Sequence, residues 1–139
     1  MDIFEWTEET ALSPSNLNEM QNIINDNITS EIKNQSKILW TNSSPTSSFA
    51  SQTITLTESL SSYDCYEIIF RQNTTSTRLM TTGKIPVGYG TILEAYGNNY
   101  RPTGTTVSGT SIYFENANAT DNGYVIPLYV IGHKTGLTF

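Results

Sequence analysis

This chain of 139 residues has few of the residues on which many catalytic and nucleic-acid-binding proteins depend. It contains one cysteine, one histidine, and seven Lys and Arg against thirteen Asp and Glu, for a net charge of −6. A single cysteine excludes an intramolecular disulfide framework, and Cys65, beside an apolar run, is expected to be a small buried hydrophobe. A lone histidine leaves no Cys/His cluster for a metal. The acidic balance argues against nucleic acid and against an anionic membrane surface as partners.

The chain also lacks long apolar runs and dense charge. No stretch approaches the roughly 20 apolar residues of a membrane span, and the acidic start MDIFEWTEE does not resemble a secretory signal. We therefore expect synthesis in a cytosol without a classical signal peptide. Charged residues make up only 14% of the chain, and Ser, Thr and Asn fill the places they would take. This composition favours β-strands with polar turns over a helical enzyme.

No recognisable catalytic motif is present. His133 follows the last apolar run, and there is no G-x-S-x-G around any serine. The glycine-rich stretch GKIPVGYG at 83–90 lacks the spacings of phosphate-binding loops. The carboxylates of the C-terminal part are dispersed, as surface charges at strand edges commonly are. We predict no enzymatic activity, no cofactor and no metal.

Residues 16–35 are the one long segment with a helical period. Apolar residues recur there at steps of three and four and fall on one face of a helix: Leu17, Met20, Ile24, Ile28 and Ile32. Ser13, Pro14 and Ser15 form a helix start, with serine capping and proline in the first turn. Because the other faces are polar and rich in the poor helix former Asn, the apolar stripe has to be covered. Either the β-domain covers it, or copies of the same helix do; our hypothesis is the second, as a trimeric bundle.

From residue 37 onward the pattern becomes that of β-structure. We predict strands at 38–41, 53–57, 66–72, 77–82, 91–96, 105–107, 111–116 and 124–132. Pro127 lies inside the most apolar of these and marks an edge or a bulge, since proline cannot donate to a ladder. Short strands at this spacing predict a mainly β fold, an antiparallel jelly-roll-like sandwich head at 36–139. Residues 1–35 form a second region, with an extended N-terminal arm followed by the helix. The arm, residues 1–12, is either a strand or loop that docks on the neighbouring fold or an attachment tail that orders on a larger assembly.

Aromatic residues in or beside the loops are the best candidates for ligand binding. Sugars stack on aromatic faces and hydrogen-bond to neighbouring amides, although such tyrosines also commonly cap a core with their hydroxyls in water. The candidate set, grouped between residues 89 and 113, is Tyr89, Tyr96, Asn98, Tyr100, Arg101 and Tyr113.

The order of several motifs gives a family resemblance. The motifs are WT at 6–7, LSPSNLNEM at 12–20, LWTN at 39–42, SSFASQTITL at 47–56, YDCYEI at 63–68, GKIPVGYG at 83–90 and YVIPLYVIG at 124–132. Together they resemble small tail- or baseplate-associated structural proteins of phages and prophages of Gram-positive bacteria. The resemblance covers most of the chain. It implies a virion component made in the host cytoplasm, a homotrimer with a β-rich head that contacts the host surface. It brings no catalytic residues.

Three functional hypotheses follow. In the first, the N-terminal arm attaches to other virion proteins, the helix trimerises, and the head binds saccharide of the host cell wall, as in a tail fibre or spike. In the second, the chain is a monomeric carbohydrate-binding module whose helix packs on its own sandwich. A head fibre or capsid-decorating protein is a variant of the first hypothesis, and a small glycan hydrolase is the third.

Overall fold

The structure is a computed structural model that describes residues 14–104, 109–118 and 122–136; within the helix, side chains are described for residues 15–25. The chain divides into two compact units, Met1–Asn34 and Gln35–Phe139. The predicted N-terminal arm and the serine cap at Ser13 lie outside the described residues. Among the described residues, no helix has both the length and the apolar character needed to span a bilayer.

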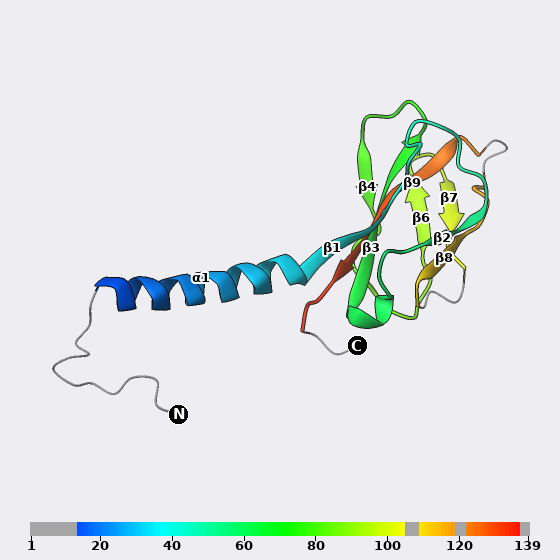
Figure 1. Ribbon diagram of the computed structural model, residues 1–139. Helices are drawn as coiled ribbons and strands as arrows, with labels where there is room; N and C mark the ends of the chain where they lie inside the picture. Colours follow the sequence, from blue (N-terminus) through cyan, green and yellow to red (C-terminus); the bar gives the residue numbers. More distant parts are fainter. Residues whose placement is uncertain (1–13, 105–108, 119–121, 137–139) are drawn as a thin grey trace. The chain divides into compact units, whose positions relative to one another are not determined.

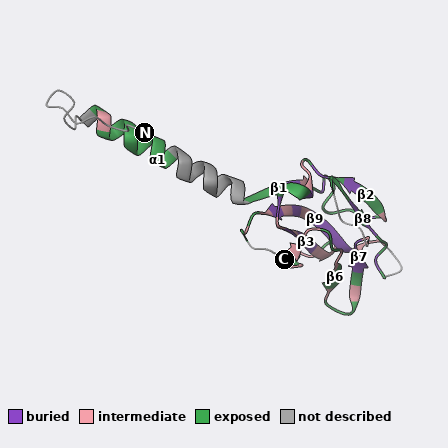
Figure 2. Ribbon diagram, turned by 90° about the horizontal axis from the view of Figure 1, so that it is seen from below, coloured by how far each residue is buried: buried purple, intermediate pink, exposed green. Residues whose placement is uncertain are grey.

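The N-terminal unit contains helix α1, Pro14–Gln35 (Figure 1). The helical period predicted this helix correctly, and Pro14 occupies its first position, where the missing N–H costs nothing. Apolar side chains in its first half are exposed, with exposed fractions from 37% at Met20 to 56% at Ile23, and Figure 2 colours this half mostly as exposed. Ile28 and Ile32 lie on the helical backbone, but their side chains are outside the described set.

The head unit is built on a larger antiparallel sheet with the order β1-β9-β3-β4, in which β5 also pairs with β3. Its strands are β1 Ser36–Thr41, β3 Cys65–Asn73, β4 Leu79–Thr81, β5 Ile85–Pro86 and β9 Tyr124–His133. Strand β9 therefore lies between the first strand of the head and β3, although it is last in sequence (Figure 1).

Two strand pairs complete the head. Strand β2, Gln52–Thr55, pairs with β8, Ser111–Phe114, and β6, Ile92–Ala95, pairs with β7, Asn99–Pro102. A bridge between Thr103 and Phe114 joins the two pairs, and the Gly104 amide donates to the Tyr113 carbonyl at 2.7 Å. The head is thus mainly β and antiparallel throughout its described part, as the sequence predicted.

Alternation along the strands buries one face of each group of strands in a common core. From the larger sheet come Leu39, Ile68 and Phe70, and from the strand pairs come Ile54 and Phe114; all are at most 4% exposed. This is the usual arrangement for antiparallel strands with one wet face. Edge-to-face contacts between aromatic rings, such as Phe49 on Phe114 at 5.5 Å between centroids, add to the packing.

Pro127 lies beside a bulge in the middle of the larger sheet. The pairing of β9 with β3 shifts register between Ile69 and Phe70, opposite Tyr129 and Pro127. The bulge leaves Leu128 without a register partner on β3, whereas Pro127 is paired with Phe70. The pairing of β9 with β1 ends at Tyr129, so Pro127 lies beyond the part of β9 that pairs with β1. The side chain of Asn42 donates to the Pro127 carbonyl at 2.8 Å. Of the two alternatives predicted for Pro127, an edge or a bulge, a bulge is present at the next residue, and Cys65 is buried, as predicted.

Two strands were not predicted. Strand β5 lies inside the glycine-rich stretch 83–90, and β7 lies where we expected a loop at 97–102. The predicted strand at 105–107 is outside the described residues. This topology is that of an antiparallel, mainly β head; the jelly-roll connectivity and the helical bundle stay predictions.

Candidate functional site

The β6–β7 hairpin carries the candidate ligand site. Residues Ala95 and Asn99 pair across its end, so the connection consists of residues 96–98. Gly97 and Asn98 both have positive φ, 83° and 64°. Glycine adopts such angles without steric cost, and asparagine tolerates them better than most residues. The tight turn in the sequence AYGNN therefore follows from its Gly-Asn pair.

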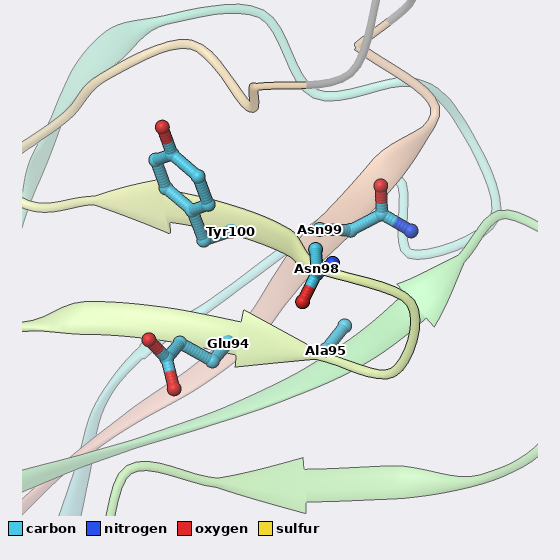
Figure 3. A pocket seen from close by; sticks show the side chains of 5 residues that line it. All are labelled: Glu94, Ala95, Asn98, Asn99 and Tyr100. Carbon is cyan, nitrogen blue, oxygen red and sulfur yellow. The ribbon is translucent and has the colours of Figure 1, made fainter.

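A pocket of about 350 Å³ opens at this hairpin and is lined by Glu94, Ala95, Asn98, Asn99 and Tyr100. Figure 3 shows Glu94 on β6 and Tyr100 on the neighbouring β7, with Asn98 and Asn99 toward the turn. Glu94 and Tyr100 are directly opposite in the register, so their side chains leave the same face of the hairpin. The lining residues of this opening thus include a tyrosine, a carboxylate residue and two asparagines, which can supply an apolar ring and groups that bind hydroxyls.

Asn118 fixes the shape of this site, and sequence reasoning did not find it. Its side-chain oxygen accepts from the Tyr100 amide at 2.7 Å, and its side-chain amide donates to the Asn98 carbonyl at 2.7 Å. Its own backbone amide donates to the Tyr100 carbonyl at 2.9 Å. Asn118 lies in a turn-rich segment 18 residues beyond Tyr100, so nothing in the local pattern connects the two.

The other predicted tyrosines are exposed but do not line this pocket. Tyr96 is in the turn itself and is 86% exposed, and Tyr89, in the connection that follows β5, is 67% exposed. Tyr113, on β8, is 44% exposed and packs over Gly104, where an added Cβ would come within 3.3 Å of it. All four tyrosines of the predicted set are exposed, but the pocket brings together only Tyr100 and Asn98 of that set.

Arg101 was predicted to contact the ligand, and this prediction is wrong. Its side chain is fully buried, and it donates to four main-chain carbonyls. These belong to Val125 at 2.9 Å, Glu115 at 2.6 Å, Phe49 at 2.7 Å and Tyr124 at 3.2 Å. Burial lowers the pKa of Arg101 to about 10, which still leaves it charged at neutral pH. Arg101 therefore ties β7 to β8, β9 and the segment before β2, and no ligand can reach it.

The described residues include no group of three or more His, Cys, Asp or Glu placed to hold a metal ion. The residues that line the hairpin pocket can form hydrogen bonds and stacking contacts. Comparison of the chain with protein-family models, curated proteins and solved structures gives no match in any of the three.

Proposed function

We propose that this chain is a non-enzymatic structural protein of a phage virion, a homotrimer of the tail-fibre or spike type. In this proposal the N-terminal arm attaches to other virion proteins, the helices of three copies form a bundle, and the jelly-roll-like head binds saccharide on the host cell surface. The assignment to a virion rests on the sequence motifs that resemble phage tail and baseplate proteins.

The exposed apolar stripe of α1 carries the oligomeric part of the proposal. Leu17 is 49% exposed, Met20 37% and Ile24 48%, and they recur on one face of an otherwise polar helix. Contiguous exposed apolar residues mark surfaces that bind a partner. The same helix in other copies of the chain can cover this stripe. Each copy presents an identical stripe, so a symmetric bundle buries all of the stripes at once.

The order of strand pairing supports the jelly-roll part. The pairs β1–β9, β2–β8 and β6–β7 are nested one inside another, as in a long hairpin folded over on itself. Jelly rolls are double-sheet folds built from such pairings. The departure is at β3, whose outer neighbour is β4, the next strand in sequence.

The hairpin pocket supports the saccharide part. Tyr100 offers a half-exposed ring, and Glu94, Asn98 and Asn99 offer hydrogen-bonding groups around the same opening. Specific pockets combine apolar contact with a few placed polar groups in this way. The same pocket would serve equally in a monomeric carbohydrate-binding module, which is the alternative function.

Measurements of mass and of a truncated chain distinguish the trimeric virion protein from the monomeric carbohydrate-binding module. We expect the full chain at micromolar concentration to have three times the monomer mass in mass photometry or sedimentation. We expect a chain lacking residues 1–35 to stay folded and to become monomeric. A monomeric full chain whose head unfolds on truncation would instead support the module with its helix packed on its own sandwich.

A glycan array with host cell-wall saccharides tests the ligand. We expect Tyr100→Ala to lose binding and Tyr89→Ala, an exposed tyrosine outside the pocket, to retain it. No binding by the unmodified protein to the array or to host cells would contradict a receptor-binding role and favour a head fibre or decorating protein, which needs no glycan site.

A further inference from the structure

A second polar site lies on the larger sheet, away from the residues of the hairpin pocket. Four side chains form a hydrogen-bonded row that follows the strand order β1-β9-β3-β4. Ser36 Oγ is 2.7 Å from His133 Nδ1, His133 Nε2 is 2.9 Å from a Glu67 oxygen, and Thr81 Oγ1 donates to the other Glu67 oxygen at 2.5 Å. His133 is therefore held at both ring nitrogens.

The Ser36 end of this row opens into a pocket of about 280 Å³. Its lining is entirely polar and contains no acidic residue: Ser36, Lys84, His133, Lys134 and Thr135. Two lysines at one small opening are unexpected in a chain with thirteen acidic and only seven basic residues. They make this opening a place where negative charge is favoured.

Neither lysine forms a close ion pair among the described residues, where the ion pairs are Lys37 with Glu58 and His133 with Glu67. Lys134 Nζ lies 5.6 Å from the centroid of the Tyr63 ring, and the charges of Lys134 and Lys84 also act on Asp64 and Glu67. Asp64 accepts from the amides of Thr135 and Gly136 at 2.6 Å and 2.8 Å. An anion in the pocket would therefore compete with these neighbours for the two lysines.

The protonation state of His133 decides what Ser36 presents to the pocket. Hydrogen bonds from Thr81 and His133 hold the pKa of Glu67 below its usual range, so its carboxylate is ionised and accepts a proton-bearing Nε2. In neutral His133 the bare Nδ1 then accepts a hydrogen bond from the Ser36 hydroxyl. In protonated His133, Nδ1–H donates to Ser36 Oγ, and the hydroxyl hydrogen is free to point into the pocket.

We propose that this pocket binds a phosphate group, and that protonation of His133 strengthens the binding. Phosphate oxygens accept several charge-assisted hydrogen bonds at once, and lysines bind them as point charges. The pocket volume exceeds that of a single phosphate, which suits the phosphate ester of a small polyol or sugar. This inference is independent of the saccharide site, since the two pockets share no residue.

The charged neighbours of His133 set the direction of the pH dependence. Glu67, on β3, hydrogen-bonds to Nε2 of the ring, and Asp64 lies just before the same strand, with its amide donating to the His133 carbonyl. Lys84 and Lys134 line the pocket beside the ring. Cys65, the register partner of His133, has a pKa raised by burial and remains neutral. Anion binding and protonation of His133 should therefore strengthen one another.

The test is a titration of the full chain with glycerophosphoglycerol, a phosphodiester whose single charge is constant across the range, at about pH 5.5 and about pH 7.5, where histidine changes charge. Chemical shifts in ¹H–¹⁵N spectra report binding at the pocket. We expect binding at both pH values and affinity at least about threefold higher at the lower one. A parallel titration with sulfate distinguishes two kinds of site. Binding of sulfate as well indicates a site for any free oxyanion, and binding of the phosphodiester alone indicates a site that requires the ester.

Variants locate the site. We expect the double variant Lys84→Gln, Lys134→Gln to bind the ligand about tenfold more weakly. The control variant Arg78→Gln removes an exposed charge just before β4, outside the pocket, and should leave the affinity unchanged. Ser36→Ala should reduce affinity only at the lower pH, because only then does the hydroxyl donate. No shifts at tens of millimolar ligand, equal affinity at both pH values, or full binding by a folded double lysine variant would each overturn the proposal, and none of these outcomes bears on the hairpin pocket.

Discussion

The two units of this chain place their apolar residues in opposite ways. In the head, Leu39, Ile68 and Phe114 are fully buried, whereas in α1 the apolar residues Ile23 and Ile24 are about half exposed. Within the described residues every buried side-chain nitrogen or oxygen has a hydrogen-bond partner. The head thus buries its apolar side chains and pairs its buried polar groups within its own unit. The apolar stripe of the helix is not buried within its own unit, and isolated helices with polar sequences are marginally stable in water.

Arg101→Leu should have the largest effect on the head. The change removes a buried guanidinium and leaves carbonyls of Phe49, Val125 and Glu115 without their donor. Buried acceptors left unpaired cost about 1 to 3 kcal/mol each, so we expect the free energy of unfolding to fall by more than about 3 kcal/mol. Urea denaturation measures it, with Arg78→Leu on the exposed surface as control. A loss below about 1 kcal/mol would show that Arg101 does not hold the strands together.

Gly132→Ala should have an intermediate effect. A Cβ at Gly132 would lie 2.8 Å from the ring of Tyr63 and 2.9 Å from a methyl of Leu39, both core residues. Overpacking of this kind costs about 1 to 3 kcal/mol. Gly104→Ala, whose Cβ would meet Tyr113 at 3.3 Å, is the graded control and should cost less. Equal thermal stability of both variants and the unmodified protein would contradict the packing described for β9.

Asp64→Asn should have a smaller and pH-dependent effect. Amides of Gly136 and Thr135 hold the pKa of Asp64 below its usual range. A carboxylate with a lowered folded pKa adds stability above its unfolded pKa of about 3.9, and that stability is lost as the pH falls through the folded value. We therefore expect the variant to melt lower than the unmodified protein at neutral pH, and the two melting curves to converge in acid. Glu94→Gln, at an exposed carboxylate, is the control, and a gap that stays constant with pH would contradict this role of Asp64.

Ile24→Asp should have the smallest effect on the head and the largest on association. The substitution places a charge in the middle of the exposed stripe, so we expect the trimer proposed here to dissociate while the melting of the head is unchanged. Asn22→Asp introduces the same charge on the opposite face of the helix and should leave the mass unaltered. If Ile24→Asp destabilised the head instead, the stripe would be covered by the β-domain of its own chain.

Much of the fold could be predicted from local patterns. The step of three and four identified α1. Alternation or short apolar runs identified β1, β2, β3, β4, β6, β8 and β9 within a few residues, because these patterns follow from backbone geometry and burial. The prediction of an edge or a bulge at Pro127 also followed from a local fact, the missing N–H of proline, and the bulge is at the next residue. These features need no knowledge of what lies across the core.

The errors have a common origin in β7. The sequence NNYRP reads as a polar loop, so the strand was missed and Arg101 was assigned to a ligand surface. In the structure Arg101 faces inward because four carbonyls from distant segments replace its water, and only tertiary contacts supply them. Asn118 was missed for the same reason, since its partners Asn98 and Tyr100 are remote in sequence.

The sequence by itself therefore determined the helix, most of the strands and the acidic, polar character of the surface, since these depend on spacing and composition. Tertiary structure alone decided which polar residues are inside. It placed Arg101 in the core. It also placed Glu94 opposite Tyr100 and Ser36 beside His133, and strand register creates such pairs between residues up to 97 positions apart. A hydrogen bond between remote side chains leaves no periodic trace in the sequence, and the candidate sites consist of such contacts.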